Sequence, residues 1–168
     1  MQNLTQLEER VLFSPNLPEP VNKLLQAAVV ANHVDKDRAE QLFKQAQALD
    51  AACLQTHFAL YKFYFYQGRL LEAEREVLTG LAAAALQGNF PADYRLLAQT
   101  PEARDMYASD IHLFYLYTLK ALAFIKLRLM AEDEAHFILN LLLELDPEDR
   151  IGASVIRQLA QALNEELA

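Results

Sequence analysis

The first candidates for chemistry in this chain of 168 residues are a glutamate and a histidine one helical turn apart. On a helix, Glu132 and His136 would lie on one face, where both could ligate a metal ion. Two ligands are too few for a zinc site, so we interpret them as a surface hydrogen-bonding pair. The other three histidines, His33, His57 and His112, have no partner at ligand spacing. We therefore predict no metal site.

Other catalytic patterns are also missing from the sequence. The four glycines are scattered singly, so there is no glycine-rich phosphate loop, and there is no HExxH motif, CxxC motif or serine nucleophile elbow. Cys53 is the only cysteine, which excludes an internal disulfide and fits a reducing compartment. We interpret it as a small buried hydrophobic residue. The sequence predicts a protein that is not an enzyme and that needs no cofactor.

The length and composition predict a single domain over residues 1–168 and argue against some classes of partner. Hydrophobic residues make up 53% of the chain, enough for a sizeable core. The net charge of −8 argues against nucleic acid or an anionic membrane as the main partner. Three cations interrupt the apolar stretch 111–130, which we interpret as a core helix rather than a membrane span. The N-terminus has no signal-peptide pattern, and we expect a cytoplasmic location.

The stretch 54–85 contains the elements that organise the rest of the chain. Residues 55–67 are apolar almost all round, and Gly68 follows them. The next segment is amphipathic, with an apolar stripe at helical spacing and charges on its other side. The stripe is Leu70, Ala73, Val77 and Leu81, and the charged face is Glu72, Glu74, Arg75 and Glu76. This pattern predicts two helices joined by a tight turn.

The same hairpin recurs on either side. Ala73 follows Ala39 by 34 positions, and Ala135 follows Ala73 by 62, which is 28 more. A small residue at the same place in three second helices allows close helix crossing. The first spacing equals the tetratricopeptide period, and the second indicates an insertion, residues 87–110. We interpret the insertion as an extra helix packed on the convex side, including a short helix over 91–97; a partner-contacting arm is the alternative.

The ends of the chain complete the predicted domain. A capping-box pattern at Thr5–Glu8 predicts a short N-terminal helix, and prolines make 14–20 a connector. We expect further helices over 21–33, 39–49, 110–129 and 132–145, and the middle hairpin extends to residue 86. The run 146–149, Asp-Pro-Glu-Asp, predicts the start of a C-terminal capping helix within 147–167. Its apolar stripe is Val155, Ile156, Leu159, Leu163 and Leu167.

These residues resemble the tetratricopeptide repeat. The middle copy matches at Leu60, Tyr61, Tyr64, Gly68, Ala73 and Val77; the last at Leu122, Ala123, Ala135, Leu139 and Pro147; the first at Ala27, Val30, Ala39, Phe43 and Ala46. The copies are degenerate, because His57 stands where a tryptophan is commonest and Val34 replaces the turn glycine. The resemblance implies an all-α fold, a right-handed array of three antiparallel helical hairpins with a C-terminal capping helix.

Four linked segments carry a closer resemblance, which covers most of the chain from Val21 onward. They are ALYKFYFYQGRLLEAE, FPADYRLL, YTLKALAFIKLRL and ELDPEDRIGASVI. They resemble the small tetratricopeptide-like proteins encoded alongside nitrogenase genes, the nitrogenase-associated factor T family. This resemblance implies a cytoplasmic, non-catalytic accessory protein that binds the nitrogenase molybdenum-iron protein and assists its assembly, protection or repair. A generic adaptor or chaperone for another protein client is the alternative.

In the tetratricopeptide family the first helix of each hairpin lines the concave, ligand-facing surface. Its ligand-facing spacings select eight residues here: Phe58, Lys62, Phe65, Tyr66, Lys120, Phe124, Leu127 and Arg128. Aromatic rings among lysine and arginine suit a protein surface or an acidic peptide segment. We expect Phe65, Tyr66, Phe124 and Arg128 to contribute most. The alternative for each residue is that the insertion or the terminal helices cover it.

Overall fold

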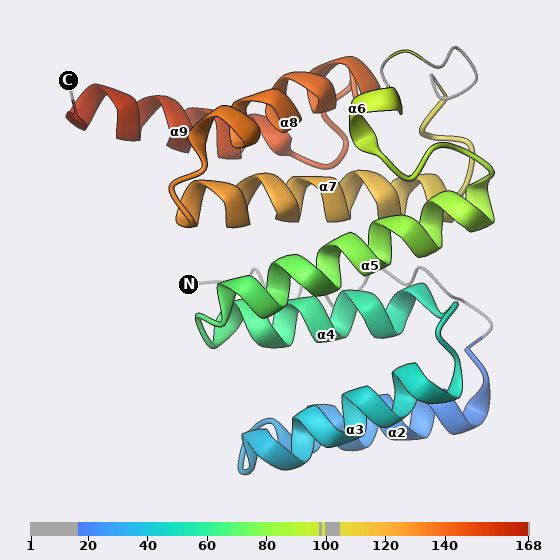
Figure 1. Cartoon of the computed structure of the whole chain (residues 1–168). Coiled ribbons are helices and arrows are strands. Elements are labelled where there is room, and N and C mark those ends of the chain that lie inside the picture. The colour runs from blue at the N-terminus through green and yellow to red at the C-terminus, as the bar shows by residue number, and fades with distance from the viewer. Residues whose placement is uncertain (1–16, 98, 100–104, 168) are drawn as a thin grey trace.

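The computed structural model describes residues 17–97, 99 and 105–167, and every regular element in that part of the chain is an α-helix (Figure 1). The helices are α2 (Glu19–Ala31), α3 (Lys36–Leu49), α4 (Leu54–Tyr66), α5 (Leu70–Gly88), α6 (Tyr94–Leu97), α7 (Asp110–Arg128), α8 (Glu132–Leu145) and α9 (Ala153–Leu167). The predicted all-α class is confirmed, and the aromatic run 63–66 belongs to α4. The helix predicted near residues 5–8 lies outside the described residues.

Six of the helices form three consecutive antiparallel pairs. In Figure 1, α2 runs back along α3, α4 along α5, and α7 along α8. Neighbouring pairs are joined by packing of α3 on α4 and by a longer contact of α5 on α7. Each pair thus contacts mainly the pair next to it along the chain.

The tight turns of the second and third pairs have the same backbone. The Arg69 amide donates to the Tyr64 carbonyl oxygen at 3.0 Å, and the Ala131 amide donates to the Lys126 carbonyl oxygen at 2.9 Å. Gly68 precedes Arg69 with a left-handed φ of 74°. This is the hydrogen-bond pattern of a Schellman turn, which ends a helix at a left-handed residue. Because glycine adopts a left-handed conformation without strain, this turn explains why Gly68 follows the aromatic run.

The first pair turns differently because the β-branched Val34 stands where the second pair has Gly68. Asp35 is the N-cap of α3, where its carboxylate accepts from the Arg38 amide at 3.0 Å. A β-branched residue such as Val34 adopts a left-handed conformation only at a cost, whereas an aspartate cap satisfies the free amides of the next helix. The cap also starts α3 at Lys36, three residues before the predicted start at Ala39.

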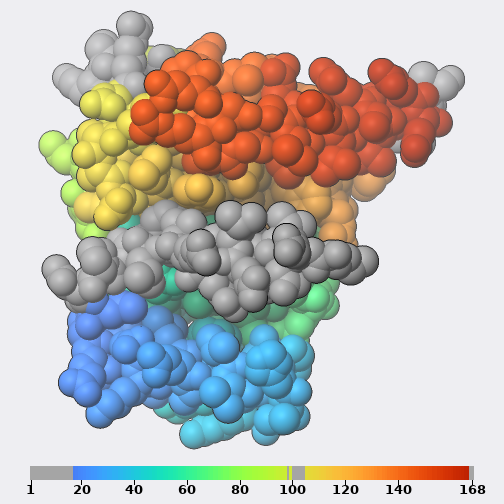
Figure 2. All heavy atoms as spheres, turned by 180° about the vertical axis from the view of Figure 1, so that it is seen from behind, coloured from blue at the N-terminus to red at the C-terminus, as the bar shows by residue number. Residues whose placement is uncertain are grey.

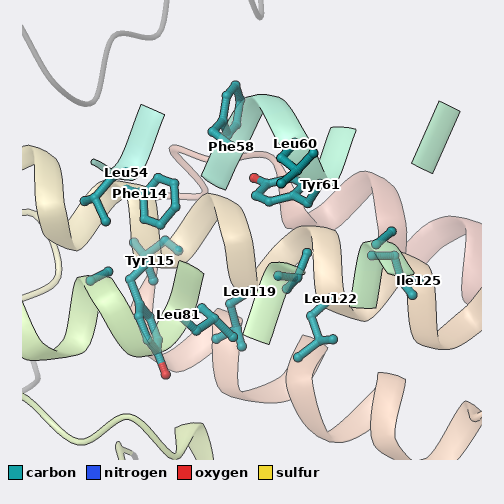
Figure 3. Packing of buried hydrophobic residues seen from close by; sticks show 14 of the residues in the cluster. Leu54, Phe58, Leu60, Tyr61, Leu81, Phe114, Tyr115, Leu119, Leu122 and Ile125 are labelled. Carbon is teal, nitrogen blue, oxygen red and sulfur yellow. The ribbon is translucent and has the colours of Figure 1, made fainter. Parts of the chain in front are cut away.

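The small residues predicted at the helix crossings are all in the core. Ala39, Ala73 and Ala135 are fully buried. A Cβ placed on Gly80 would lie 3.3 Å from the Cβ atom of His57 and 3.4 Å from the Phe114 ring, so α5 approaches both α4 and α7 at this point. Figure 3 shows the core between these helices. Its labelled side chains are Leu54, Phe58, Leu60, Tyr61, Leu81, Phe114, Tyr115, Leu119, Leu122 and Ile125.

The described part of the insertion packs against α8. Tyr94 is buried, its hydroxyl donates to Glu134 Oε1 at 3.3 Å, and its ring centroid lies 6.1 Å from that of Phe137. The short helix expected over 91–97 begins at Tyr94. Further along, the Tyr107 hydroxyl donates to the Asp146 carboxylate. These contacts make the segment a covering layer on the second helix of the third pair.

The prediction that residues 146–149 start the last helix is wrong. Asp146 is buried, and its carboxylate accepts from the amides of Arg150 at 2.9 Å and Ile151 at 3.1 Å. Those bonds close a turn instead of capping a helix, and α9 begins only at Ala153. Asp149 then accepts from the Ser154 amide at 3.2 Å.

The predicted apolar stripe of α9 is only partly used for packing. Ala153 and Ala160 are buried and Ile156 is half-buried, whereas Val155, Leu159 and Leu163 are about half exposed. Figures 1 and 2 both show the second half of α9 extending past the helix pairs. Among the described helices, none combines the length and the apolar character needed to cross a bilayer.

Candidate functional site

Four of the predicted partner-binding residues lie together where α4 and α7 end. The ring centroids of Phe65 and Phe124 are 5.4 Å apart, and those of Phe65 and Tyr66 are 5.7 Å apart. The Arg128 guanidinium lies 5.7 Å from the Phe65 ring centroid. We call Phe65, Tyr66, Phe124 and Arg128 the Phe65 cluster. It joins the first helices of two different pairs.

The Phe65 cluster combines anchored rings with solvent-exposed groups. Phe65 and Phe124 are half-buried, so helix packing fixes their positions, whereas Tyr66 is 65% exposed and Arg128 is exposed. Within the described part of the chain, Arg128 forms no salt bridge. A guanidinium on an aromatic face keeps its N–H donors directed outward, where they can bind a carboxylate. Tyrosine, phenylalanine and arginine are common anchors in protein interfaces.

The remaining predicted residues have more structural roles. Phe58 is only 7% exposed, and Lys62 Nζ covers its ring at 4.2 Å from the centroid. Lys120 Nζ donates to the Ile151 carbonyl oxygen at 2.7 Å and lies 5.2 Å from the Tyr117 ring centroid. Leu127 is half-buried against the core. Their contribution to binding stays a prediction.

In the second and third pairs, cations and acids are divided between the first and second helices. The first helices α4 and α7 carry four cations, Lys62, Lys120, Lys126 and Arg128, and one acid, Asp110. The second helices α5 and α8 carry one base, Arg75, and seven acids: Glu72, Glu74, Glu76, Glu132, Asp133, Glu134 and Glu144. Lys62 lies on the Phe58 ring and Arg128 on the Phe65 ring, so the surface along α4 and α7 is locally cationic and aromatic although the protein is acidic. Such a surface attracts acidic groups despite the net charge of the chain.

Some of the acids of α5 and α8 are not free surface charges. The sequence pattern placed Glu74 on an exposed face, but its carboxylate binds Lys126 Nζ, which also lies 2.9 Å from Glu134 Oε2. The hydrogen bond from Lys126, with another from Arg95, lowers the pKa of the Glu134 carboxyl. This ion cluster ties α5, α6, α7 and α8 together, and it directs Lys126 away from the Phe65 cluster.

A second ion cluster links the first and second pairs. Arg69 binds Glu40 through both Nη atoms, at 2.8 and 3.1 Å, and the Tyr64 hydroxyl donates to the same carboxylate at 3.1 Å. The hydrogen bond from Arg69 is the main reason that the pKa of Glu40 falls from 4.5 to about 2. Bidentate geometry fixes the end of α4 against α3.

Sequence reasoning missed the buried polar contacts of His57. Its Nδ1 lies 2.9 Å from Glu76 Oε1, and its Nε2 lies 2.8 Å from the Ala51 carbonyl oxygen. Gln47 Nε2 also donates to Glu76 Oε1, at 2.5 Å. One feature of the sequence could have predicted this. His57 stands where the tetratricopeptide pattern most often has tryptophan, a buried ring that carries an N–H group.

The histidine and glutamate proposed as a surface pair lie on one turn of α8. His136 Nε2 is 3.4 Å from Asn164 Nδ2 on α9. His112 Nδ1 is 2.7 Å from the Ser109 hydroxyl at the start of α7. Among the described residues, no three side chains of histidine, cysteine, aspartate or glutamate lie close enough to hold a metal ion.

Comparisons of the chain with protein-family models, with curated proteins and with solved structures found no match.

Proposed function

We propose that the three helix pairs are degenerate tetratricopeptide-like repeats in a right-handed array, with α9 as the capping helix. The spacing of Ala39, Ala73 and Ala135 supports this proposal, because all three are fully buried. The shared turn geometry of the second and third pairs supports it as well. In such an array α2, α4 and α7 line one surface and α3, α5 and α8 the other.

We propose that the protein is a non-catalytic, cytoplasmic accessory factor that binds a protein partner on the surface formed by α4 and α7. The observation that carries this proposal is the Phe65 cluster, in which aromatic rings from two pairs meet under a guanidinium. Interfaces draw most of their binding energy from a few such aromatic and arginine anchors. The cations of α4 and α7 favour an acidic segment on the partner.

The partner that we propose is the nitrogenase molybdenum-iron protein. This choice rests on the resemblance of four linked segments to the nitrogenase-associated factor T family. Assembly, protection or repair all require the accessory protein to distinguish one state of its client from another. A factor of this kind binds one state more tightly, because only differential affinity shifts a population.

The test is an affinity measurement with purified molybdenum-iron protein in its resting, inactivated and cofactor-deficient forms. We expect one form to bind more tightly than the others. Phe65→Ala and Arg128→Ala should each weaken that complex by about 2 kcal/mol, roughly thirtyfold in Kd. Matched controls lie on the second helices: Phe137→Ala on α8 and Arg75→Ala on α5 replace exposed residues of the same types.

Two outcomes contradict different parts of the proposal. If no form of the molybdenum-iron protein binds, the partner is wrong, and a generic adaptor or chaperone for another client becomes the better interpretation. If a form binds but the Phe65 and Arg128 variants bind as tightly as the Phe137 and Arg75 variants, the partner stands and the surface is wrong. Circular dichroism of each variant verifies that it is folded.

A further inference from the structure

The imidazole of His57 is enclosed by hydrogen-bond acceptors. The residue is 1% exposed, so water does not replace its partners. Nε2 points at the Ala51 carbonyl oxygen at 2.8 Å, and a carbonyl oxygen can only accept. Nδ1 points at Glu76 Oε1 at 2.9 Å, and an ionised carboxylate can only accept. Both ring nitrogens must therefore carry a proton for both bonds to form.

A neutral imidazole cannot satisfy this geometry. It has one N–H donor and one lone pair, so either Ala51 or Glu76 would face a lone pair instead of a proton. A buried acceptor that loses its donor has no water to bind and costs folding free energy. The Gln47 amide partly compensates at Glu76, where it already donates, but it lies 3.4 Å from Nδ1 and contributes no bond to Ala51.

His57 contacts residues of both the first and the second helix pair. The residue lies on α4 near its start, Ala51 belongs to the connection between α3 and α4, and Gln47 belongs to α3. The charged groups that face the ring are Glu76 from α5 and Asp50 from the α3–α4 connection. From α7, the Phe114 ring approaches the same crossing at Gly80. His57 thus connects the first helix pair to the second.

We propose that protonated His57 is a lock between the first helix pair and the rest of the array. Loss of the ring proton removes one of its two hydrogen bonds and loosens the α3–α4 junction. The α2–α3 pair then opens more readily, while the α5–α7–α8 body stays closed. The lock makes the orientation of the first pair depend on pH.

The electrostatics of the site agree with this role. Burial lowers the pKa of His57, but the hydrogen bonds to Glu76 and Ala51 and the charges of Glu76 and Asp50 together raise it above its ordinary value of 6.5. A raised pKa stabilises the folded state fully at pH values below the unfolded pKa. That stabilisation is lost as the pH rises through the folded pKa, so the lock opens on the alkaline side.

Hydrogen–deuterium exchange of the full chain tests the lock, with opening constants corrected for the pH dependence of chemical exchange. Between about pH 6 and pH 9, a range that spans the usual histidine pKa, opening of peptides from α2 and α3 should rise several-fold. Peptides from α7 and α8 in the same sample are the internal control and should not follow this rise. The His57 ring should titrate above pH 6.5 by NMR, as its folded environment requires.

Variants separate the lock from general destabilisation. His57→Phe should open the first pair at every pH and abolish the pH dependence. Glu76→Gln keeps an oxygen acceptor but removes the charge, so it should move the opening to lower pH; Glu144→Gln, an exposed substitution on α8, should leave it unchanged. An equal pH response of all helix pairs, a response that persists in His57→Phe, or a ring that titrates below pH 6.5 would each overturn the proposal. If His57→Phe does not fold, the shift in Glu76→Gln decides.

Discussion

Met130 in the α7–α8 turn has the same left-handed backbone as Gly68 in the α4–α5 turn, with φ angles of 63° and 74°. Both residues precede the amide that closes the turn, and both come five positions before a buried alanine, Ala135 or Ala73. Glycine adopts this conformation without a steric penalty, whereas methionine must bring its Cβ close to the backbone. The third pair therefore holds a strained residue where the second pair does not.

Relief of this strain should stabilise the protein. Met130→Gly removes a left-handed penalty of about 1–2 kcal/mol but adds freedom to the unfolded chain, for a net gain of about 0.5–1 kcal/mol. The converse change, Gly68→Ala, should cost about 1 kcal/mol, since a Cβ there meets no neighbour and only the backbone is strained. Urea unfolding measures both changes. A lower midpoint for Met130→Gly would show that the Met130 side chain contributes packing despite its exposure.

Overpacking should be costly at the crossing between α4 and α5. Ala73 is fully buried, so Ala73→Leu should destabilise the fold by roughly 1–3 kcal/mol. Arg75→Leu, two positions on and exposed, is the matched control and should change stability by less than about 0.5 kcal/mol. Glu74 is unsuitable as a control because its carboxylate binds Lys126. Equal urea midpoints for the two variants would contradict the assignment of Ala73 as a crossing residue.

Acid should weaken the link between the first and second pairs. The pKa of Glu40 is lowered from 4.5 to about 2, so its contribution is complete above pH 4.5 and is lost as the pH falls through about 2. Because solvent partly screens Glu40 and Arg69, the ionised Glu40 carboxylate contributes on the order of 1–2 kcal/mol to the free energy of unfolding. Wild type and Glu40→Gln should therefore differ in unfolding free energy at pH 6 and converge near pH 2. A constant difference across this range would mean that the Glu40 charge has no part in it.

The cations of α4 and α7 should act mainly on the rate of association with an acidic partner. Lys62→Ala should lower the association rate at low salt, and the effect should fade as salt screens the charge. Stopped-flow measurements at several ionic strengths give this comparison, and Arg75→Ala on the opposite layer serves as the control. If Lys62→Ala instead changed only the dissociation rate at every salt concentration, Lys62 would be a buried contact of the complex.

Local patterns were sufficient to predict most of the helices. Glu132–Leu145 was predicted with the bounds that α8 has, and the Ser109 cap marked the start of α7. The error at residues 146–149 has a non-local cause. An aspartate before proline resembles a helix cap, but here the Asp146 carboxylate is held by Tyr107, 39 residues earlier, and by amides of its own turn. A pattern within four residues contains no information about Tyr107.

The sequence also predicted only part of the candidate site. Helical spacing selected Phe65 and Phe124 on two segments 59 residues apart, and the structure places their rings in contact. Spacing gave no sign that the two cations at the end of α7 have different partners. Lys126 binds acids of α5 and α8, whereas Arg128 lies on the Phe65 ring. Spacing also did not predict the contact between His57 and Glu76. A bond between the two helices of a hairpin depends on how each helix is rotated about its axis.

Tyr64, Tyr94 and Tyr107 each donate a hydrogen bond to a carboxylate, so their absorbance can be used to follow unfolding. Burial, with the neighbouring carboxylates, raises the pKa of all three phenols above 10. In alkali they should remain protonated until the helices separate, because ionisation favours the unfolded chain. The chain has seven tyrosines and no tryptophan, so the ultraviolet band of tyrosinate is not obscured by indole. A late, cooperative step in that band marks the pH at which the helix pairs come apart.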